Sequence, residues 1–269
     1  MFASVLLLML LAGMAFFGLK AHSEALAYEK ATTELVAKQG AEEQAKLQLE
    51  KLAKSILGPL YEDTRQQALI QIEERQSHAK SEAEKFTRYF MYLLGALLLS
   101  YFFITLRIFT IFASLSTLLT LLFGLLTPIL MVTIHKEVEY LGDVVLSFES
   151  KGVIGSIAKL FENGDTIIAL VILLFSVLIP LLKVTALLFV SLFAHNEVAH
   201  KIIKFFKLIG KWSMVDVFVV ATFLVYLTID KGDISRAEVE VGLYFFLAYV
   251  IVSMLVSLSA DKMLQRMKA

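Results

Sequence analysis

The sequence predicts an all-α polytopic membrane protein, with about six transmembrane helices and an N-terminal helical hairpin outside the membrane. The 269-residue chain is 58% hydrophobic, and its mean hydropathy is +0.75. The apolar residues form blocks of about 17 to 28 residues, enough to cross a hydrocarbon core roughly 30 Å thick. Helices are expected for these blocks, because a single segment in lipid can satisfy its backbone only internally.

Six apolar blocks are candidate spans, and they cover residues 2–19, 89–106, 108–134, 166–193, 213–229 and 241–260. The first lacks a basic leader region, so we expect a signal anchor and not a cleaved signal peptide. The connection at Arg107 is the least marked, because no Gly or Pro lies near it. A single helix over 88–134 would nevertheless be about 70 Å long, so a break near Arg107 is expected. Five crossings and one interfacial helix remain the alternative.

The flanking charges predict the orientation of the spans. Segment 194–212 contains four lysines and one acid, and the tail 261–269 is also basic, so both are expected on the cytoplasmic side. Segments 135–165 and 230–240 contain more acids than bases and are expected outside. Both termini are then cytoplasmic, and residues 20–88 lie outside.

Residues 20–88 predict a hairpin of two long helices. Good helix formers of mixed charge fill the segment, and Gly58-Pro59 interrupts it, so helices are expected over 22–57 and 60–87. Apolar side chains that can meet between the arms are Ala45, Leu49, Leu52 and Ile56 on the first and Leu69 and Ile72 on the second. The hairpin should be tight at its tip and looser at its base. It is either a solvated spacer or a docking surface.

The external segment 135–165 shows weak local signals. The run 144–148 alternates in polarity and predicts a short strand. Residues 156–162 predict a short helix that Asn163-Gly164 ends. The segment is too short for an independent domain.

Two ionisable residues lie inside predicted spans. Lys183 follows Pro180, which should kink the fourth span. Asp216 lies about one turn beyond Trp212, the expected interface anchor, and Ser213 is placed to cap the fifth span. The fourth and fifth spans are consecutive and antiparallel, so Lys183 and Asp216 can meet. They form either a structural ion pair or a protonatable pair that couples to a conformational change.

Other polar residues could support this pair. Thr127 precedes Pro128, a second candidate kink, in the third span. Ser253, Ser257 and Ser259 lie in the last span, although serines in membrane helices more often serve packing.

The composition argues against several classes of protein. The chain has no cysteine, which excludes disulfides and cysteine-ligated metals. Its five histidines lack the spacing of a metal site, and its net charge of zero gives no indication of nucleic-acid binding. No catalytic constellation is visible, so no enzymatic activity and no cofactor are predicted.

Three stretches resemble the paraquat-inducible protein A (PqiA/LetA) family. They are Thr127-Pro128, residues 176–183 (SVLIPLLK) and residues 210–218 (GKWSMVDVF), and the resemblance covers about 113–260. It implies one four-helix PqiA-like module over 113–269. Residues 1–112 would then form a separate part: the first span, the hairpin (about 22–87) and the second span.

The resemblance also implies a function. Family members work in the bacterial inner membrane with a periplasmic MCE-domain partner that carries lipid, and Lys183 and Asp216 match the family's intramembrane basic and acidic positions. We therefore expect an inner-membrane component of a lipid transport system that handles phospholipid and is proton-coupled through this pair. A non-transporting scaffold or envelope-stress sensor that uses the hairpin is the alternative. An ion-coupled small-molecule transporter is a third reading, and a homo-oligomer stays open.

Overall fold

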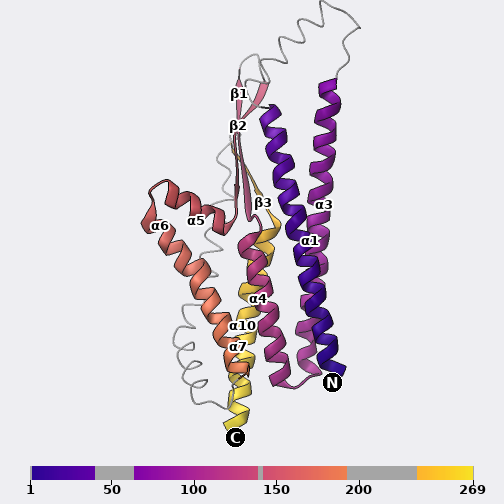
Figure 1. Cartoon of the computed structure of the whole chain (residues 1–269), viewed down its shortest axis with the longest axis vertical. Coiled ribbons are helices and arrows are strands. Elements are labelled where there is room, and N and C mark those ends of the chain that lie inside the picture. The colour runs from indigo at the N-terminus through magenta and orange to yellow at the C-terminus, as the bar shows by residue number, and fades with distance from the viewer. Residues whose placement is uncertain (1, 40–63, 139–141, 193–234, 269) are drawn as a thin grey trace, which may run out of the picture.

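The computed structural model describes residues 2–39, 64–138, 142–192 and 235–268. Its helices are α1 (Phe2–Gln39), α3 (Thr64–Leu99), α4 (Leu106–Leu126), α5 (Val153–Glu162), α6 (Thr166–Ile172), α7 (Ile179–Leu192) and α10 (Val241–Lys268). Its strands are β1 (Leu130–Val138), β2 (Gly142–Lys151) and β3 (Ser235–Val239). Figure 1 shows the N- and C-terminal ends of the chain at one end of the molecule, and the sheet lies toward the other end.

Helices that can cross a membrane dominate the described residues. Four are long and apolar enough: Ala3–Lys38, Leu106–Leu126, Thr166–Leu192 and Val241–Met263. The predicted class, an all-α polytopic membrane protein, is confirmed. The predicted span 213–229 lies outside the described residues. Of the predicted span 89–106, residues 89–99 form the end of α3, which is not among those four helices.

The predicted break near Arg107 is confirmed. Helix α3 ends at Leu99, a 3-10 turn covers Ser100–Phe102, and Thr105 is extended before α4 begins at Leu106. Arg107 therefore lies in the first turn of α4, and its Nη2 donates a hydrogen bond to the carbonyl of Leu192 at 3.3 Å. This bond ties the start of α4 to the end of α7.

The two arms of the predicted hairpin are single helices that continue out of the bundle. Helices α1 and α3 lie side by side along their length (Figure 1). The residues predicted to close the tip, 45–56, lie outside the described residues. At the base, small side chains let the arms approach closely, and the comparison of base with tip stays a prediction. The buried alanines at this contact are Ala21, Ala25, Ala79 and Ala83.

A three-stranded antiparallel sheet joins the predicted strand to two segments that were expected to be helix or loop. Its order is β2-β1-β3, and β1 lies between the other two strands. The strand predicted at 144–148 is confirmed within β2, and the short helix is confirmed as α5, after which Gly164 takes a φ of +87°. Strand β3 was not predicted.

The third predicted span is shorter than expected, because the helix ends at the candidate kink, Pro128. We expected helix to Ile134, but α4 ends at Leu126 and Thr127 is extended, with φ −86° and ψ 145°. The ring of Pro128 disfavours helical backbone at the preceding residue, so Pro128 ends α4 and does not kink it. Strand β1 starts two residues later.

The main apolar core joins the helices of both predicted parts of the chain. Phe90 of α3 packs edge-on against Phe245 of α10 and Phe123 of α4, with ring centroids 4.9 and 5.9 Å apart. Leu187 of α7 belongs to the same buried cluster. The N-terminal arms are thus packed onto the rest of the bundle, although the division at residue 112 stays a prediction.

Helices α4 and α10 cross at very short range at the sheet end of the bundle. A Cβ at Gly242 would collide with the carbonyl oxygens of Thr127 and Pro128, and one at Gly124 would lie 2.9 Å from the backbone nitrogen of Phe246. The Gly242 amide donates to the carbonyl of Pro128 at 2.9 Å. These glycines fix where α10 starts, and therefore where β3 leads into it.

Candidate functional site

Lys183 lies in the most apolar of the candidate spans. Residues 166–192 form a continuous helix, in which an 18-residue stretch has a mean hydropathy of 2.9. A π-helical turn, Leu173–Leu178, ends two residues before Pro180. Proline has no N–H for the regular helical hydrogen bond, and its ring crowds the carbonyl one turn earlier. A wider π turn before the proline relieves both effects. The π turn ends five residues before Lys183, and the kink expected at Pro180 stays a prediction.

Lys183 is buried, with 9% of its surface exposed, although it sits among apolar residues. Its Nζ donates a hydrogen bond to Oγ of Ser253 on α10, at 3.3 Å. Val184 and Tyr249 belong to the buried apolar cluster around this contact. Of the predicted supporting serines, Ser253 therefore contacts the lysine.

Two other serines of α10 have different surroundings. Ser259 is buried, and its Oγ donates to the carbonyl of Leu255 within the same helix at 3.0 Å. Ser257 is half-buried. A supporting role for Ser257 stays a prediction.

Asp216, Trp212 and Ser213 lie outside the described residues. Their roles as counter-charge, interface anchor and helix cap stay predictions.

Thr127 lies at the sheet end of the bundle and contacts the N-terminal arm. Its Oγ1 is fully buried and lies 3.2 Å from Nδ1 of His22 on α1. The predicted support residue thus links the end of α4 to α1.

A row of buried hydroxyls along α4 went unnoticed in the sequence. Each donates to a carbonyl three or four residues earlier, so each is satisfied within its own helix. They belong to Thr110, Ser114, Ser116, Thr117 and Thr120. Their small size permits close packing, as in other membrane helices.

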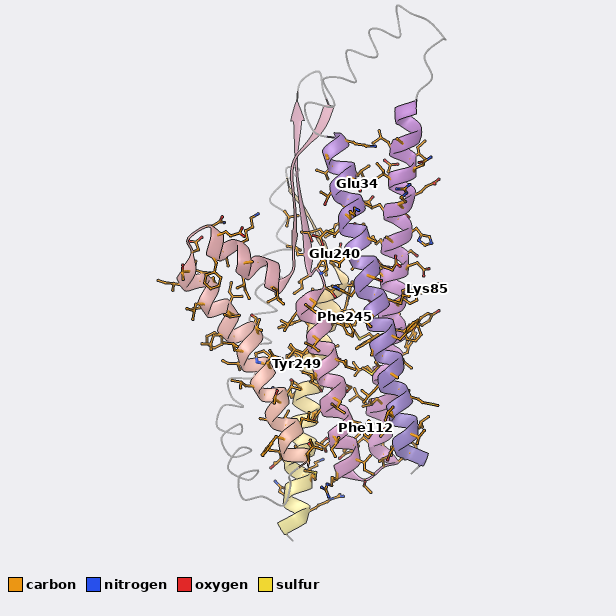
Figure 2. The ribbon with its side chains drawn as sticks, viewed as in Figure 1. Glu34, Lys85, Phe112, Glu240, Phe245 and Tyr249 are labelled. Carbon is orange, nitrogen blue, oxygen red and sulfur yellow. The ribbon has the colours of Figure 1, made fainter. Side chains whose placement is uncertain are left out.

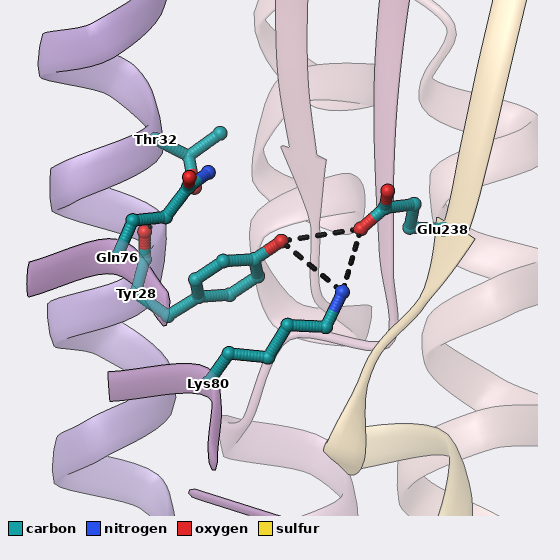
Figure 3. Close-up of polar contacts among 5 residues, drawn as sticks. All are labelled: Tyr28, Thr32, Gln76, Lys80 and Glu238. Atoms are coloured by element: carbon teal, nitrogen blue, oxygen red, sulfur yellow. Dashed lines mark hydrogen bonds and ion pairs between the residues drawn. The ribbon is translucent and has the colours of Figure 1, made fainter. Parts of the chain in front are cut away.

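A second polar cluster lies outside the bundle, where the hairpin meets the sheet (Figure 3). Lys80 of α3 forms an ion pair with Glu238 of β3, with Nζ 2.9 Å from Oε2. The hydroxyl of Tyr28 on α1 donates to the same carboxylate oxygen at 3.1 Å. Lys80 also lies 5.3 Å from the centre of the Tyr28 ring. Burial lowers the pKa of Lys80, but the hydrogen bond to Glu238 and nearby charges outweigh it and raise that pKa overall.

Glu240 is the most unusual carboxylate of the described chain. It precedes α10 and is only 4% exposed, and its Oε1 has no hydrogen-bond partner among the described residues. Figure 2 places it where α10 begins, beyond Phe245 and Tyr249. Burial raises the pKa of Glu240 to about 8, with Lys80 opposing the rise and the carboxylates of Glu238, Glu84 and Glu29 adding to it.

A pocket of about 300 Å³ lies beside this carboxylate. Its walls come from both hairpin arms, from the end of β3 and from the start of α10. The residues that line it include Tyr28, Lys80, Glu84, Arg88, Met91, Glu240 and Tyr244.

Sequence reasoning missed this outer cluster because its members are far apart in the chain. Tyr28, Lys80 and Glu238 each look like solvated residues in a charged segment. The available signal was Glu240, an acid directly before an apolar span.

Among the residues that the structure describes, no group of three or more His, Cys, Asp or Glu side chains could hold a metal ion. Of the acidic and basic residues, Lys183 and Glu240 are those that lie buried in the described part of the chain.

The described helices and the buried lysine between α7 and α10 define a multi-pass membrane protein. The sequence model of the family described as "Paraquat-inducible protein A" matches residues 109–265. The chain belongs to this family. The expected resemblance is confirmed, and the hairpin arms lie outside the matched residues.

A "Probable intermembrane transport protein" of Haemophilus influenzae is 26% identical to this chain over 117 residues. The match covers 41% of this chain but only 28% of that relative. The chain thus spans well under half of the relative's length. No solved structure matches the chain significantly.

Proposed function

We propose that this chain is the membrane component of a lipid transport system, which moves phospholipid between the membrane it spans and a carrier outside that membrane. The observation that carries the proposal is Lys183, buried between apolar helices with its Nζ on Ser253. Membership of the family and the printed name of the H. influenzae relative support a transport role.

A charged residue at this place needs a reason. Placing a lysine at the centre of a membrane helix costs about 2.5 to 3.5 kcal/mol on insertion scales, so such residues usually mark sites of function. The hydroxyl of Ser253 offsets only part of this cost. Asp216 is the proposed counter-charge, and the pair would exchange a proton during transport.

The π turn next to Pro180 supplies a place where the helix can change shape. Regular hydrogen bonding is already interrupted over Leu173–Leu178, and π turns often occur at functional sites. A change of charge at Lys183 would alter its contact with α10 five residues beyond the end of this turn. We propose that protonation of the pair switches the packing of α7 against α10.

The partner follows from the family resemblance. We propose a periplasmic MCE-domain carrier on the hairpin side, with the chain in a bacterial inner membrane and both termini cytoplasmic. The sheet and hairpin lie toward one end and both chain ends at the other, which supports this orientation (Figure 1). The protein would act without enzymatic chemistry.

Site-specific photo-crosslinking tests the proposal. A photoreactive residue at Leu181, which is partly buried against the cluster near Lys183, should capture phospholipid in cells. The same residue at Leu258, which is 55% exposed on α10, reports lipid that merely surrounds the protein. Lys183→Met should reduce capture at Leu181 and leave capture at Leu258 unchanged. Absence of lipid at Leu181 in the unmodified protein would refute transport through this site.

The hairpin favours a second candidate, a scaffold that recruits a partner without moving lipid. A groove of about 590 Å³ runs between the arms. Its charged residues are Glu24, Lys30, Glu34, Glu74, Arg75 and His78. Reversing Glu24 and Glu34 to lysine should abolish partner capture under this reading while leaving lipid crosslinks at Leu181 intact.

A further inference from the structure

The pocket beside Glu240 lies at the depth where lipid head groups are found. The last candidate span begins at Val241, directly after Glu240. Tyr244 is 54% exposed one turn further on, the place where tyrosines concentrate at membrane interfaces. The pocket therefore opens at the boundary between hydrocarbon and water, on the side of the hairpin.

The pocket offers charges of both signs. Lys80, Glu84 and Arg88 follow one another at intervals of four along α3, so their side chains share a face of that helix. Glu84 and Arg88 are exposed, whereas Glu240 is buried at the start of α10. Basic groups on the rim can bind a phosphate, and carboxylates can bind a cation.

The buried carboxylate selects among cations. Oε1 of Glu240 has no hydrogen-bond partner among the described residues, and a buried polar group without a partner is costly. A proton on Glu240 would remove the charge but leave this atom without a bond. A primary ammonium would supply both an N–H donor and a positive charge, whereas a quaternary ammonium has no N–H to donate.

The remaining walls are apolar. Met91 and Val241 line the pocket together with Tyr244. Its volume of about 300 Å³ is at the lower end for small-molecule sites, so it suits a head group without its acyl chains. The chains can lie along the lipid-facing side of α10, where Leu247 and Ile251 are exposed.

We infer that this pocket binds the head group of an amine-bearing phospholipid, with the ammonium on Glu240 and Glu84 and the phosphate on Arg88 and Lys80. An anionic head group without an amine would bring no positive charge to Glu240 and Glu84. Most of the walls come from hairpin residues outside the range that the family model matches. The inference rests on the proposed lipid transport function and gives it a substrate class.

Lipid exchange tests the inference. The full-length protein in detergent is equilibrated with equal amounts of phosphatidylethanolamine, phosphatidylcholine and phosphatidylglycerol, and the retained lipid is analysed by mass spectrometry. The ethanolamine lipid should be enriched about tenfold, the factor that corresponds to one charge-assisted hydrogen bond of about 1.4 kcal/mol. Equal retention of the three lipids would overturn the inference.

Three variants sharpen the test. Glu240→Gln should abolish the enrichment, and Arg88→Gln, a change at an exposed residue, should weaken retention of the ethanolamine lipid without affecting the fold. Glu82→Gln is the matched control, because that carboxylate pairs with Lys85 and not with the pocket. Persistent enrichment in both Glu240→Gln and Arg88→Gln would overturn the inference.

Two further measurements separate the sources of the ligand and the two proposals. Soluble glycerophosphoethanolamine should compete far more weakly than the lipid, and equal competition would overturn the assignment to a lipid. If photo-crosslinks at Leu181 persist but no head-group preference is found, only the pocket inference fails. If the preference is found without those crosslinks, the transport proposal fails alone.

Discussion

Replacing Glu240 by glutamine should change how the stability of the protein depends on pH. The substitution keeps the shape of the side chain and removes its ionisation. Burial raises the pKa of Glu240 from 4.5 to about 8. Between these values the folded state keeps a proton that the unfolded state releases, so the free energy of unfolding falls as pH rises.

The size of the effect follows from the span between the two pKa values. Each pH unit between the two pKa values lowers the free energy of unfolding by about 1.4 kcal/mol. By about pH 8 the wild-type protein should therefore have lost on the order of 5 kcal/mol of unfolding free energy relative to Glu240→Gln. Below about pH 4.5 the carboxyl is neutral in both states, and the relative loss should vanish. Above about pH 8 it should stay constant.

Thermal unfolding in detergent, followed by circular dichroism from pH 5 to 9, measures this difference. The wild-type midpoint should fall relative to that of Glu240→Gln as pH rises, because the variant lacks the titrating group. Glu82→Gln, which alters a carboxylate bonded to Lys85, should follow the wild type. Parallel curves for wild type and Glu240→Gln, or a relative gain of the wild type with pH, would refute the reasoning.

Three further predictions concern packing and polar contacts. Gly242→Ala places a methyl group against the carbonyls at the end of α4 and should destabilise the protein by about 1 to 3 kcal/mol. Gly155→Ala should instead stabilise the protein by roughly 0.5 to 1 kcal/mol, because a Cβ there would have nothing within 4 Å. Equal changes in stability for the two glycine substitutions would contradict the steric argument. A double-mutant cycle of Lys80→Met and Glu238→Gln should give a coupling of about 0.5 to 1 kcal/mol, because the ion pair is partly exposed, and 1 M salt should reduce it. Coupling that salt leaves unchanged would argue against an exposed pair. Ser253→Ala removes an acceptor of the buried lysine and should lower stability by about 1 to 3 kcal/mol, and an unchanged melting temperature would contradict this.

Much of the membrane architecture could be predicted, because lipid imposes strong rules on length and composition. Apolar blocks gave helices 106–126, 166–192 and 241–263 near the expected places. The break before Arg107 followed from length alone, since one helix across it would exceed the thickness of the membrane. The helical arms followed from composition and the Gly58-Pro59 interruption.

The sheet could not be predicted in the same way. Strand pairing joins β1 to β3, which lies about a hundred residues later, and periodicity reports only on local structure. Residues 130–134 are apolar and continue the third span in sequence. Only the extended backbone at Thr127 showed that Pro128 had ended the helix.

The candidate sites divide along the same line. Lys183 could be found from the sequence, because a charged side chain stands out within an apolar run. Its contact with Ser253 required the packing of α7 on α10. Glu238 and Lys80 do not stand out in this way, because each lies in a polar segment.

The sequence alone therefore determined that the chain crosses a membrane repeatedly, that a helix breaks near Arg107 and that Lys183 lies within a span, since hydrophobicity and helix length act locally. Only the tertiary structure decided that the hairpin packs onto the sheet, that Glu240 is buried at their junction and that a pocket forms there. Those features arise because Tyr28, Lys80 and Glu240, which are far apart in the sequence, line one pocket, and no local sequence pattern records that proximity.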